Sequence, residues 1–293
     1  MKKREIIEGV IKDYDFPNKG SFELDGKKVI VKGALPGQKV SCMVSKVRKD
    51  KAEARLLDVL ERSEIEDAVP PCPQFGICGG CAYQTMSYEH QLELKAGQVK
   101  KLLDGVIDSE THPYDWEGII GSPVTTAYRN KMEYSFGDEY KDGPLVLGLH
   151  KKNSMYDIVP VCNCVIVSED YNRIVSYTME FAREHGLSYH KKMQHVGLLR
   201  HLVLRQSKTN GGLLVNLVTS TDGLENLDLN AYVDGLLALP LDGTIIGILH
   251  TANDSLADAV VPEKVTLLYG RDYIEEEVLG LHFQISPFSF FHL

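Results

Sequence analysis

Three of the six cysteines of this chain lie within ten residues, in the stretch CPQFGICGGCAYQ that begins at Cys72. The C-x5-C-x2-C spacing places the thiols of Cys72, Cys78 and Cys81 on one tight loop. Gly79 and Gly80 let the backbone fold beneath a bound ion without a Cβ clash. Three thiolates so close together repel one another, so we expect a cation or a metal cluster to hold them. The other cysteines are Cys42, Cys162 and Cys164.

The spacing by itself leaves the kind of site open. Tetrahedral zinc and a [4Fe–4S] cluster both need four ligands, so one ligand must come from outside the loop. Zinc sites usually combine two paired knuckles, whereas a tight triplet with one distant cysteine is more typical of iron–sulfur ligation. The spacing matches neither common ferredoxin pattern, and unligated structural thiols are the third alternative. Cys42 lies within a predicted strand and is interpreted as a small buried apolar side chain.

Composition and length narrow the class of protein. The length of 293 residues is enough for two domains or three small ones. With 43% apolar and 25% charged residues, the composition is that of an ordinary globular protein. The N-terminal residues lack the apolar run of a secretory signal, and no stretch approaches the roughly 18 apolar residues of a membrane span. We therefore expect a cytoplasmic protein with no membrane partner. In that compartment clustered cysteines indicate metal binding or catalysis rather than disulfides.

Charge is distributed unevenly along the chain. The net charge is −9, but residues 1–63 carry 15 Lys and Arg against 10 Asp and Glu. A basic N-terminal module on an acidic body is compatible with a polyanionic partner that docks at one end, although chance variation in surface charge produces the same asymmetry.

The hydrophobic pattern predicts a small β domain followed by an α+β body. Five short strands are expected in residues 1–62, and closure into a barrel removes their exposed edges. Ser87 is a predicted N-cap for a helix over residues 88–104, which Gly105 ends. From Tyr128 the period changes to two, and a second helix is expected from Ser168 to Gly186. Helices mixed with mostly antiparallel strands are typical of the α+β class.

The extended run CPQFGICGGCAYQTMSYEHQLELK resembles the signature of RumA-type 23S ribosomal RNA (uracil-5-)-methyltransferases, where it binds a [4Fe–4S] cluster. The first 62 residues, with ALPGQKV, resemble the TRAM domain of that family, an OB-like RNA-binding β-barrel. AYRNKMEYSF, LGLHKKNSMYDIVPV, GLLRHLVLRQS and ISPFSFFHL resemble landmarks of its central domain. The resemblance implies a TRAM barrel at 1–63, a mixed α/β central domain at 64–280 with a cluster loop at 72–84, and the start of a methyltransferase domain at 281–293.

The resemblance also implies the fourth cluster ligand. In the family, the remaining cysteine follows the DIVPV strand after a two-residue gap, which falls on Cys164. The implied metal ligands are therefore Cys72, Cys78, Cys81 and Cys164, with Cys162 in reserve.

The family mechanism requires groups that this sequence does not contain. A cysteine thiolate adds to C6 of uracil, C5 takes the methyl group of S-adenosylmethionine, and a base removes the C5 proton. We find no Gly-rich loop between a strand and a helix, and no Asp-Pro-Pro stretch with a downstream cysteine. The resemblance therefore predicts an enzyme without its C-terminal methyltransferase domain, inactive alone, whose helix 88–104 packs on the absent domain.

Basic and aromatic residues of the family motifs predict the contacts with RNA. The predicted RNA-binding residues are Arg129, Lys131, Arg200, Arg205, Lys46 and Arg48. Phe290 and His292 match a segment that lines the uridine and cofactor pocket, with histidine in place of the usual glutamine. Without a following domain, the C-terminal phenylalanines lose their cover, so we expect poor order there.

The leading hypothesis is a monomeric part of a 23S rRNA methyltransferase, in which the cluster serves folding or RNA positioning. The main alternative is a non-enzymatic RNA-binding module with a structural zinc site. A small electron carrier is a third hypothesis, which the long polar body disfavours.

Overall fold

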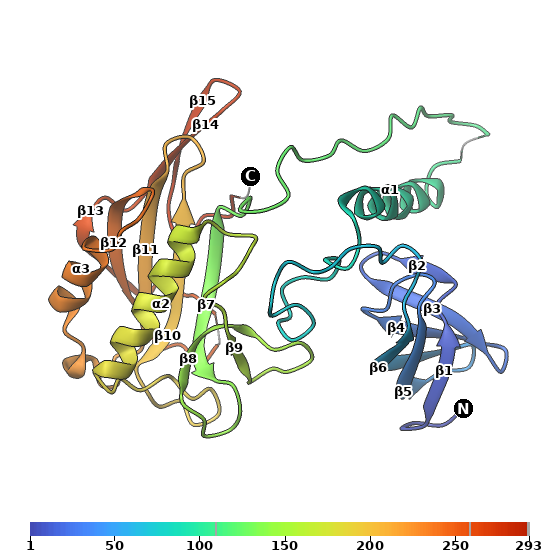
Figure 1. Cartoon of the computed structure of the whole chain (residues 1–293), viewed down its shortest axis with the longest axis horizontal. Helices are drawn as coiled ribbons and strands as arrows, with labels where there is room; N and C mark the ends of the chain where they lie inside the picture. The colour runs from blue at the N-terminus through green and yellow to red at the C-terminus, as the bar shows by residue number, and fades with distance from the viewer. Residues whose placement is uncertain (109, 258, 292–293) are drawn as a thin grey trace. The chain divides into compact units, whose positions relative to one another are not determined.

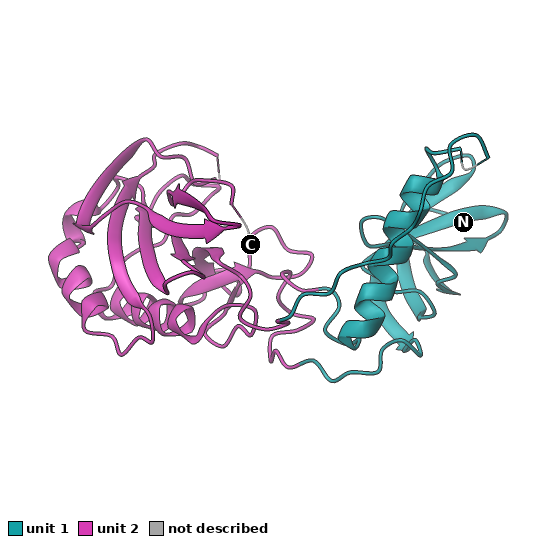
Figure 2. Cartoon of the chain, turned by 90° about the horizontal axis from the view of Figure 1, so that it is seen from above, with its two compact units in different colours: residues 1–70, 82–123 teal, residues 71–81, 124–293 magenta. Residues whose placement is uncertain are grey.

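The computed structural model describes residues 1–108, 110–257 and 259–291 (Figure 1). The chain divides into two compact units, Met1–Pro70 with Ala82–Pro123, and Pro71–Cys81 with Val124–Leu293 (Figure 2). This division assigns the three loop cysteines and Cys164 to the same unit. The predicted domain limits at residues 63 and 280 stay a prediction.

The first unit is built on one six-stranded sheet. Its strands in chain order are β1 (Ile6–Val10), β2 (Asp13–Asp15), β3 (Lys19–Leu24), β4 (Lys27–Lys32), β5 (Lys39–Val47) and β6 (Lys51–Glu61), and their order in the sheet is β1-β5-β6-β4-β3-β2. Apolar side chains from alternate positions of these strands form one buried cluster, which includes Val29, Val31 and Cys42. Strand alternation of this kind places every second side chain on the core face.

The expected closed barrel is not formed. Within the described residues the hydrogen-bonded order begins at β1 and ends at β2, with no pairing between these two strands. They follow one another in the chain, and the backbone changes partner between them: Ile11 N–H donates to Gln38 and Lys12 N–H to Ser21. β1 instead approaches β3 through a side chain, because the ring of Phe22 fills the space that a Cβ on Gly9 would need. β1 pairs with β5 and β2 pairs with β3, so the two consecutive strands lie at opposite ends of the hydrogen-bonded order.

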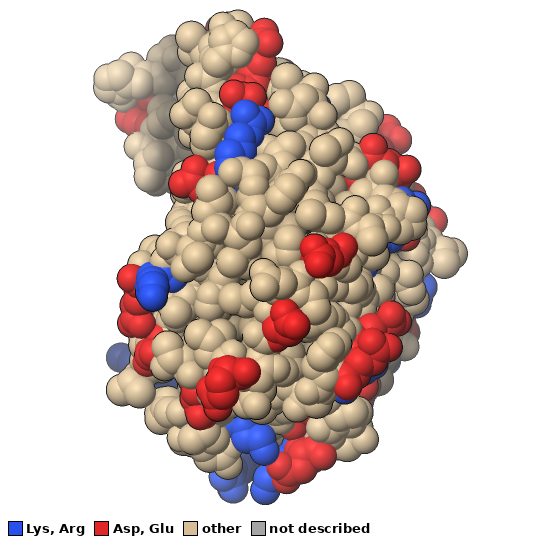
Figure 3. Space-filling view, turned by 90° about the vertical axis from the view of Figure 1, so that its left-hand side faces the viewer, with Lys and Arg blue, Asp and Glu red and all other residues tan. Residues whose placement is uncertain are grey.

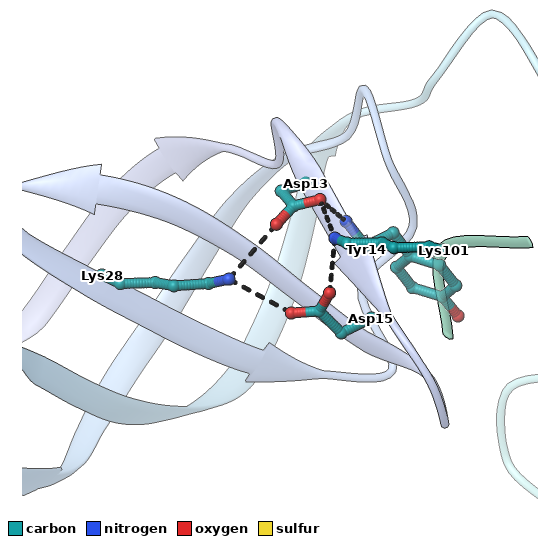
Figure 4. Close-up of polar contacts among 5 residues, drawn as sticks. All are labelled: Asp13, Tyr14, Asp15, Lys28 and Lys101. Atoms are coloured by element: carbon teal, nitrogen blue, oxygen red, sulfur yellow. Dashed lines mark hydrogen bonds and ion pairs between the residues drawn. The ribbon is translucent and has the colours of Figure 1, made fainter. Parts of the chain in front are cut away.

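Helix α1 (Tyr88–Asp104) confirms the predicted helix and its cap, since the Ser87 hydroxyl accepts from the N–H of His90. The sequence analysis expected this helix to pack on a following domain. In the structure Lys101 of α1 lies 2.7 Å from Asp13 and 2.5 Å from Asp15 of β2, and Lys28 contacts the same carboxylates (Figure 4). Hydrogen bonds from Lys101 lower the pKa of both carboxyls. Exposed pairs of this kind contribute about 0–1 kcal/mol each, so they orient the helix more than they stabilise it.

The second unit is built on a seven-stranded sheet with two helices. Its elements are β7 (Lys131–Asp138), β8 (Leu145–His150), β9 (Ile158–Pro160), α2 (Glu169–Glu184), β10 (Leu199–Gln206), β11 (Gly212–Thr219), the short 3-10 helix η1 (Leu224–Asn226), α3 (Leu229–Leu237), β12 (Thr244–Ala252), β13 (Lys264–Gly270), β14 (Ile274–Val278) and β15 (Leu281–Ile285). The sheet order is β13-β12-β11-β10-β7-β8-β9, and β14 pairs with β15 as a separate hairpin. β11 and β12 run parallel, and α3 makes the crossover that parallel strands require. The mixed α and β architecture with few helices agrees with the predicted class.

Both faces of the central strands are covered, and every residue of β10 and β11 is buried. α2 lies across one face of the sheet (Figure 1) and buries Tyr171, Ile174 and Val175, which share one side of the helix. The hairpin β14–β15 packs on the core through Ile274 and Ile285. The core is therefore continuous across β10 and β11, and these strands offer no side chains to solvent.

Gly148 of β8 tests how tightly the edge of this sheet is packed. A Cβ at Gly148 would meet the backbone carbonyl oxygen of Val159 well inside 3.0 Å, and a backbone atom cannot rotate away. We expect Gly148→Ala to lower the free energy of unfolding by about 2 kcal/mol, measured by urea denaturation followed by circular dichroism. Gly97→Ala is the matched control, because nothing lies within 4 Å of that position and the helix favours alanine. Equal stability of the Gly148 variant and the wild type would show that β9 is free to shift.

Candidate metal centre and nucleic-acid interface

The cysteine loop is attached to the end of β8. The N–H of Gly79 donates to the carbonyl of His150 at 2.9 Å, and the N–H of Lys152 donates to the carbonyl of Ile77 at 2.7 Å. Cys78 forms an antiparallel bridge with Lys151. The loop therefore continues the ladder beyond β8, and these bonds attach its backbone to the chain that follows β8.

Cys164 reaches the same region through the next strand. β9 pairs antiparallel with β8, with Ile158 opposite His150, and the chain leaves β9 toward Cys164. Asn172 of α2 fixes the backbone there, since its side-chain oxygen accepts from Cys164 N–H at 2.9 Å and its amide group donates to the Cys164 carbonyl at 3.4 Å. The pairing of two short strands thus brings together cysteines that lie more than eighty residues apart in the chain.

Electrostatics show that the four thiols influence one another. Burial raises the pKa of the Cys164 thiol, and Cys72, Cys81 and Cys78 raise it further because a second thiolate nearby is unfavourable. Burial also raises the pKa of Cys78, although the N–H of Gly80 points at its sulfur and opposes the rise. The reserve residue Cys162 is partly buried. Burial raises the pKa of Tyr134, and Cys164 and Cys162 raise it further. Repulsion of this kind disappears when a cation binds the sulfurs.

The residues that the structure describes contain no group of three or more His, Cys, Asp or Glu side chains placed to hold a metal ion. The expected iron–sulfur loop is therefore not shown. The chemistry of the donor set is nevertheless compatible with such a group, since the four cysteines belong to one unit and Cys72, Cys81 and Cys78 each raise the pKa of Cys164.

Two of the predicted RNA-binding residues donate hydrogen bonds to backbone carbonyls of the protein. Arg200 is 3% exposed and donates to the carbonyls of Asn253, Ser255 and Ala257. Arg205 is fully buried and donates to the carbonyls of three residues near the C-terminus, Pro287, Ser289 and Phe291. Both guanidinium groups hold loops and are covered by protein, and their assignment as RNA contacts stays a prediction.

Lys131 is also engaged by the protein. Its side chain is 13% exposed, and its ammonium lies 2.6 Å from the carboxylate of Glu133. Arg129 is exposed, although its Nε donates to the carbonyl of Lys131 at 3.1 Å. Its backbone N–H donates to the carbonyl of Ile166, and its charge opposes the rise in the pKa of Tyr128 that burial, Cys81 and Cys164 cause. Tyr128, 39% exposed, is a candidate contact that the sequence analysis missed, although it precedes Arg129 in the AYRNK motif.

Lys46 and Arg48 lie at the end of the β5–β6 hairpin of the first unit, and both are exposed. The N–H of Arg48 donates to the carbonyl of Lys51 at 2.7 Å, which closes the hairpin, and the ammonium of Lys27 donates to the Arg48 carbonyl. Several cationic side chains thus surround one turn. On the side of the molecule where α3 lies, by comparison, Asp and Glu side chains outnumber Lys and Arg (Figure 3), which disfavours that side as a phosphate-binding surface.

The C-terminal segment differs from the expectation of poor order. Residues 287–291 are held by Arg205, and Phe291 packs against the cluster of Leu214 and Ile274. Phe290 is 95% exposed, and its assignment to a substrate pocket stays a prediction. His292 lies outside the described residues. None of the described helices is both long and apolar enough to cross a membrane.

No protein-family model matches the chain. The chain is 46% identical over 292 residues to an uncharacterized RNA methyltransferase of Clostridium acetobutylicum. The matched residues make up 99% of this chain and 62% of that protein. The chain is 44% identical over 293 residues to one of Caldanaerobacter subterraneus, covering 99% and 63%. A crystal structure of a Pyrococcus abyssi tRNA (uracil-54, C5)-methyltransferase with S-adenosyl-L-homocysteine matches with a TM-score of 0.67 and 24% identity, over 97% of this chain and 60% of that one. The chain thus shares its fold with that protein and spans less than two thirds of the relatives it matches.

These comparisons correct the recognition made from the cysteine motif. Relatives named only as RNA methyltransferases match 99–100% of the chain, and the similar solved structure is named for tRNA rather than 23S rRNA. The assignment to the 23S rRNA-specific family is therefore not retained. The conclusion that a C-terminal domain is missing, which depended on that assignment, is dropped with it. The expected inactivity of the chain finds no support in these matches, and its monomeric state stays a prediction.

Proposed function

We propose that the protein is an S-adenosylmethionine-dependent RNA (uracil-5-)-methyltransferase in which the residues described here recognise RNA. The proposal is supported by the names of relatives that are 44–46% identical over 99% of this chain. It is also supported by a shared fold with a methyltransferase whose name gives uracil C5 as its target. The observation in this structure that carries it is the exposed pair Tyr128 and Arg129 beside the four cysteines.

The pair Tyr128 and Arg129 supplies the two kinds of contact that unpaired RNA needs. A guanidinium binds phosphate through charge-assisted, often bidentate hydrogen bonds. The half-buried ring of Tyr128 offers an aromatic face on which a splayed base stacks. In the first unit, Lys46 and Arg48 add positive charge for further phosphates. Neither residue group carries out the methyl transfer, so their contribution is affinity and positioning.

We further propose that Cys72, Cys78, Cys81 and Cys164 hold a [4Fe–4S] cluster. Such a cluster would supply a rigid link between the loop after residue 71 and the chain that leaves β9, and methyl transfer requires no electron from it. Because Arg129 is hydrogen-bonded through its backbone next to Cys164, a rigid link there would also hold the arginine toward RNA. Four cysteine thiolates can also bind a tetrahedral zinc ion. Measurement of the iron and zinc contents distinguishes the two kinds of site.

Substitution of Arg129 tests the role in RNA binding. We expect Arg129→Ala to weaken binding of a fluorescein-labelled, uridine-containing single-stranded RNA on the order of tenfold, because one charge-assisted phosphate contact is lost. The slope of log affinity against log salt should fall by about 0.7, the value for one phosphate of a single strand. Fluorescence anisotropy over a series of salt concentrations measures both quantities.

The matched control is Arg183→Ala, which removes an exposed arginine from α2, and it should leave affinity and salt slope unchanged. If wild-type protein does not bind RNA, or if both variants lose affinity equally, the proposed function is wrong.

A further inference from the structure

A pocket of about 400 Å³ opens in the second unit, between the turn that follows β7 and the segment 189–194. Its lining includes Asp138, Lys141, Tyr156, Asp157, Tyr189 and Lys191. The volume lies within the range of small-molecule sites and suits a single nucleotide. Tyr156 and Asp157 belong to the motif LGLHKKNSMYDIVPV, but none of these lining residues is among the RNA-binding residues that the sequence analysis named.

One wall of the pocket is fixed by hydrogen bonds and charge. The hydroxyl of Tyr189 donates to the carboxylate of Asp138 at 2.8 Å. The ammonium of Lys191 lies 5.9 Å from the centre of the Tyr189 ring and 3.6 Å from Asp142. Tyr189 is thereby held in one orientation, so this wall is formed before any ligand arrives.

Another part of the lining presents an aromatic ring to solvent. Tyr156 is 55% exposed, and its hydroxyl lies 3.7 Å from the sulfur of Met193, which is itself 74% exposed. A large ring left half in water at the mouth of a pocket gains from being covered by another flat ring. Stacking of a nucleobase is sequence-tolerant and is the usual use of such a ring in proteins that bind single strands.

Polar groups in the pocket are available to a ligand. The carboxylate of Asp157 has no hydrogen-bond or ion-pair partner within the described residues, while its backbone N–H donates to the Ser154 hydroxyl. Lys141 is exposed and likewise makes no side-chain contact with the described part of the chain. A carboxylate accepts but does not donate, so the pocket selects a base edge that carries donors.

We propose that this pocket binds one unpaired guanine nucleotide of an RNA strand, with its base on Tyr156 and its phosphate at Lys141. The adjacent N1–H and N2–H donors of guanine match the two oxygens of the Asp157 carboxylate, as the paired donors of arginine do. Uracil offers a single N–H between two carbonyl oxygens, which the carboxylate repels. The inference rests on the proposed function and adds a second point of contact with a defined base.

Binding of two short RNAs tests the proposal. The probes are a labelled oligouridine and the same strand with one guanosine at its centre, measured by fluorescence anisotropy. We expect the wild type to bind the guanosine strand about fivefold more tightly, because stacking and hydrogen bonding both contribute. Tyr156→Ala should abolish this preference, and Asp157→Asn should remove most of it while binding of oligouridine stays constant.

Controls lie at the other edge of the same sheet, on β13. Tyr269→Ala and Lys264→Ala remove exposed side chains of the same types and should keep the preference. Circular dichroism checks that each variant is folded. We expect Tyr156→Ala to fold, because the side chain of Tyr156 is exposed.

The outcomes separate the two proposals. Wild-type protein that binds both strands equally, with no change in Tyr156→Ala, overturns the guanine pocket and leaves RNA binding intact. Wild-type protein that binds neither strand overturns both. Photochemical crosslinking of the guanosine strand to the peptide that contains Tyr156 would support the pocket directly, and crosslinking elsewhere would oppose it.

Discussion

Replacement of Arg205 by alanine is expected to lower the free energy of unfolding by about 3–5 kcal/mol. The guanidinium is fully buried and donates to three carbonyls of residues 287–291. Its removal leaves buried acceptors without donors and a cavity beside β10, and each unsatisfied group costs about 1–3 kcal/mol. Burial lowers the pKa of Arg205, but an arginine stays charged in proteins, so the loss applies at every ordinary pH.

Urea denaturation of the variant measures this loss, and Arg271→Ala supplies the control. Arg271 is about one third exposed and pairs with Glu275 at 3.1 Å, so its replacement should change stability by less than about 0.5 kcal/mol. In Arg205→Lys the charge is kept, but the lysine side chain cannot reach three carbonyls. The free energy of unfolding of this variant should therefore lie between those of the alanine variant and the wild type. A variant with wild-type stability and lost RNA affinity would support the interpretation of Arg205 as an RNA contact.

Replacement of Cys81 by serine is expected to remove most of the bound iron from protein purified without oxygen, together with its brown colour. A cluster with three remaining thiolates loses a strong ligand, and the hydroxyl of serine does not replace it under neutral conditions. Cys164→Ser should have the same effect although Cys164 lies far away in the sequence, because in addition to burial the three loop cysteines raise the pKa of its thiol. Iron and zinc analysis of each protein is the measurement.

Cys42→Ala is the matched control, since that residue is buried in the sheet of the first unit and burial raises its pKa to about 11. It should keep the full iron content, and Cys162→Ser should do so as well if Cys164 is the fourth ligand. If the analysis finds one zinc per wild-type chain, the four cysteines form a structural zinc site and not an iron–sulfur site. Wild-type protein with neither metal would show that the thiols are structural and would end the proposal of a metal centre.

Local features of the sequence were sufficient to predict helix α1 with its two ends and the cysteines that share one loop. Ser87 and Gly105 mark the two ends of α1, because capping and helix termination depend on residues within one turn. The spacing of Cys72, Cys78 and Cys81 predicted one loop, and turn hydrogen bonds such as that from Phe75 N–H to the Cys72 carbonyl fold this segment. The mixed class of the second unit followed from the change in hydrophobic period near Tyr128.

Sequence by itself therefore determined which residues share a turn, a helix or a loop, while the tertiary structure decided what is buried and what meets across the chain. Arg200 and Arg205 lie in a motif rich in charge, yet neighbouring strands and loops cover them, and no local pattern reports that cover. The order β1-β5-β6-β4-β3-β2 of the first sheet, with no pairing between β1 and β2 in the described residues, is not revealed by the count of strands. Cys164 joins the loop cysteines only through the pairing of β8 with β9 and the hydrogen bonds of Asn172. Contacts between distant segments depend on how whole elements pack, and that information is spread over the chain.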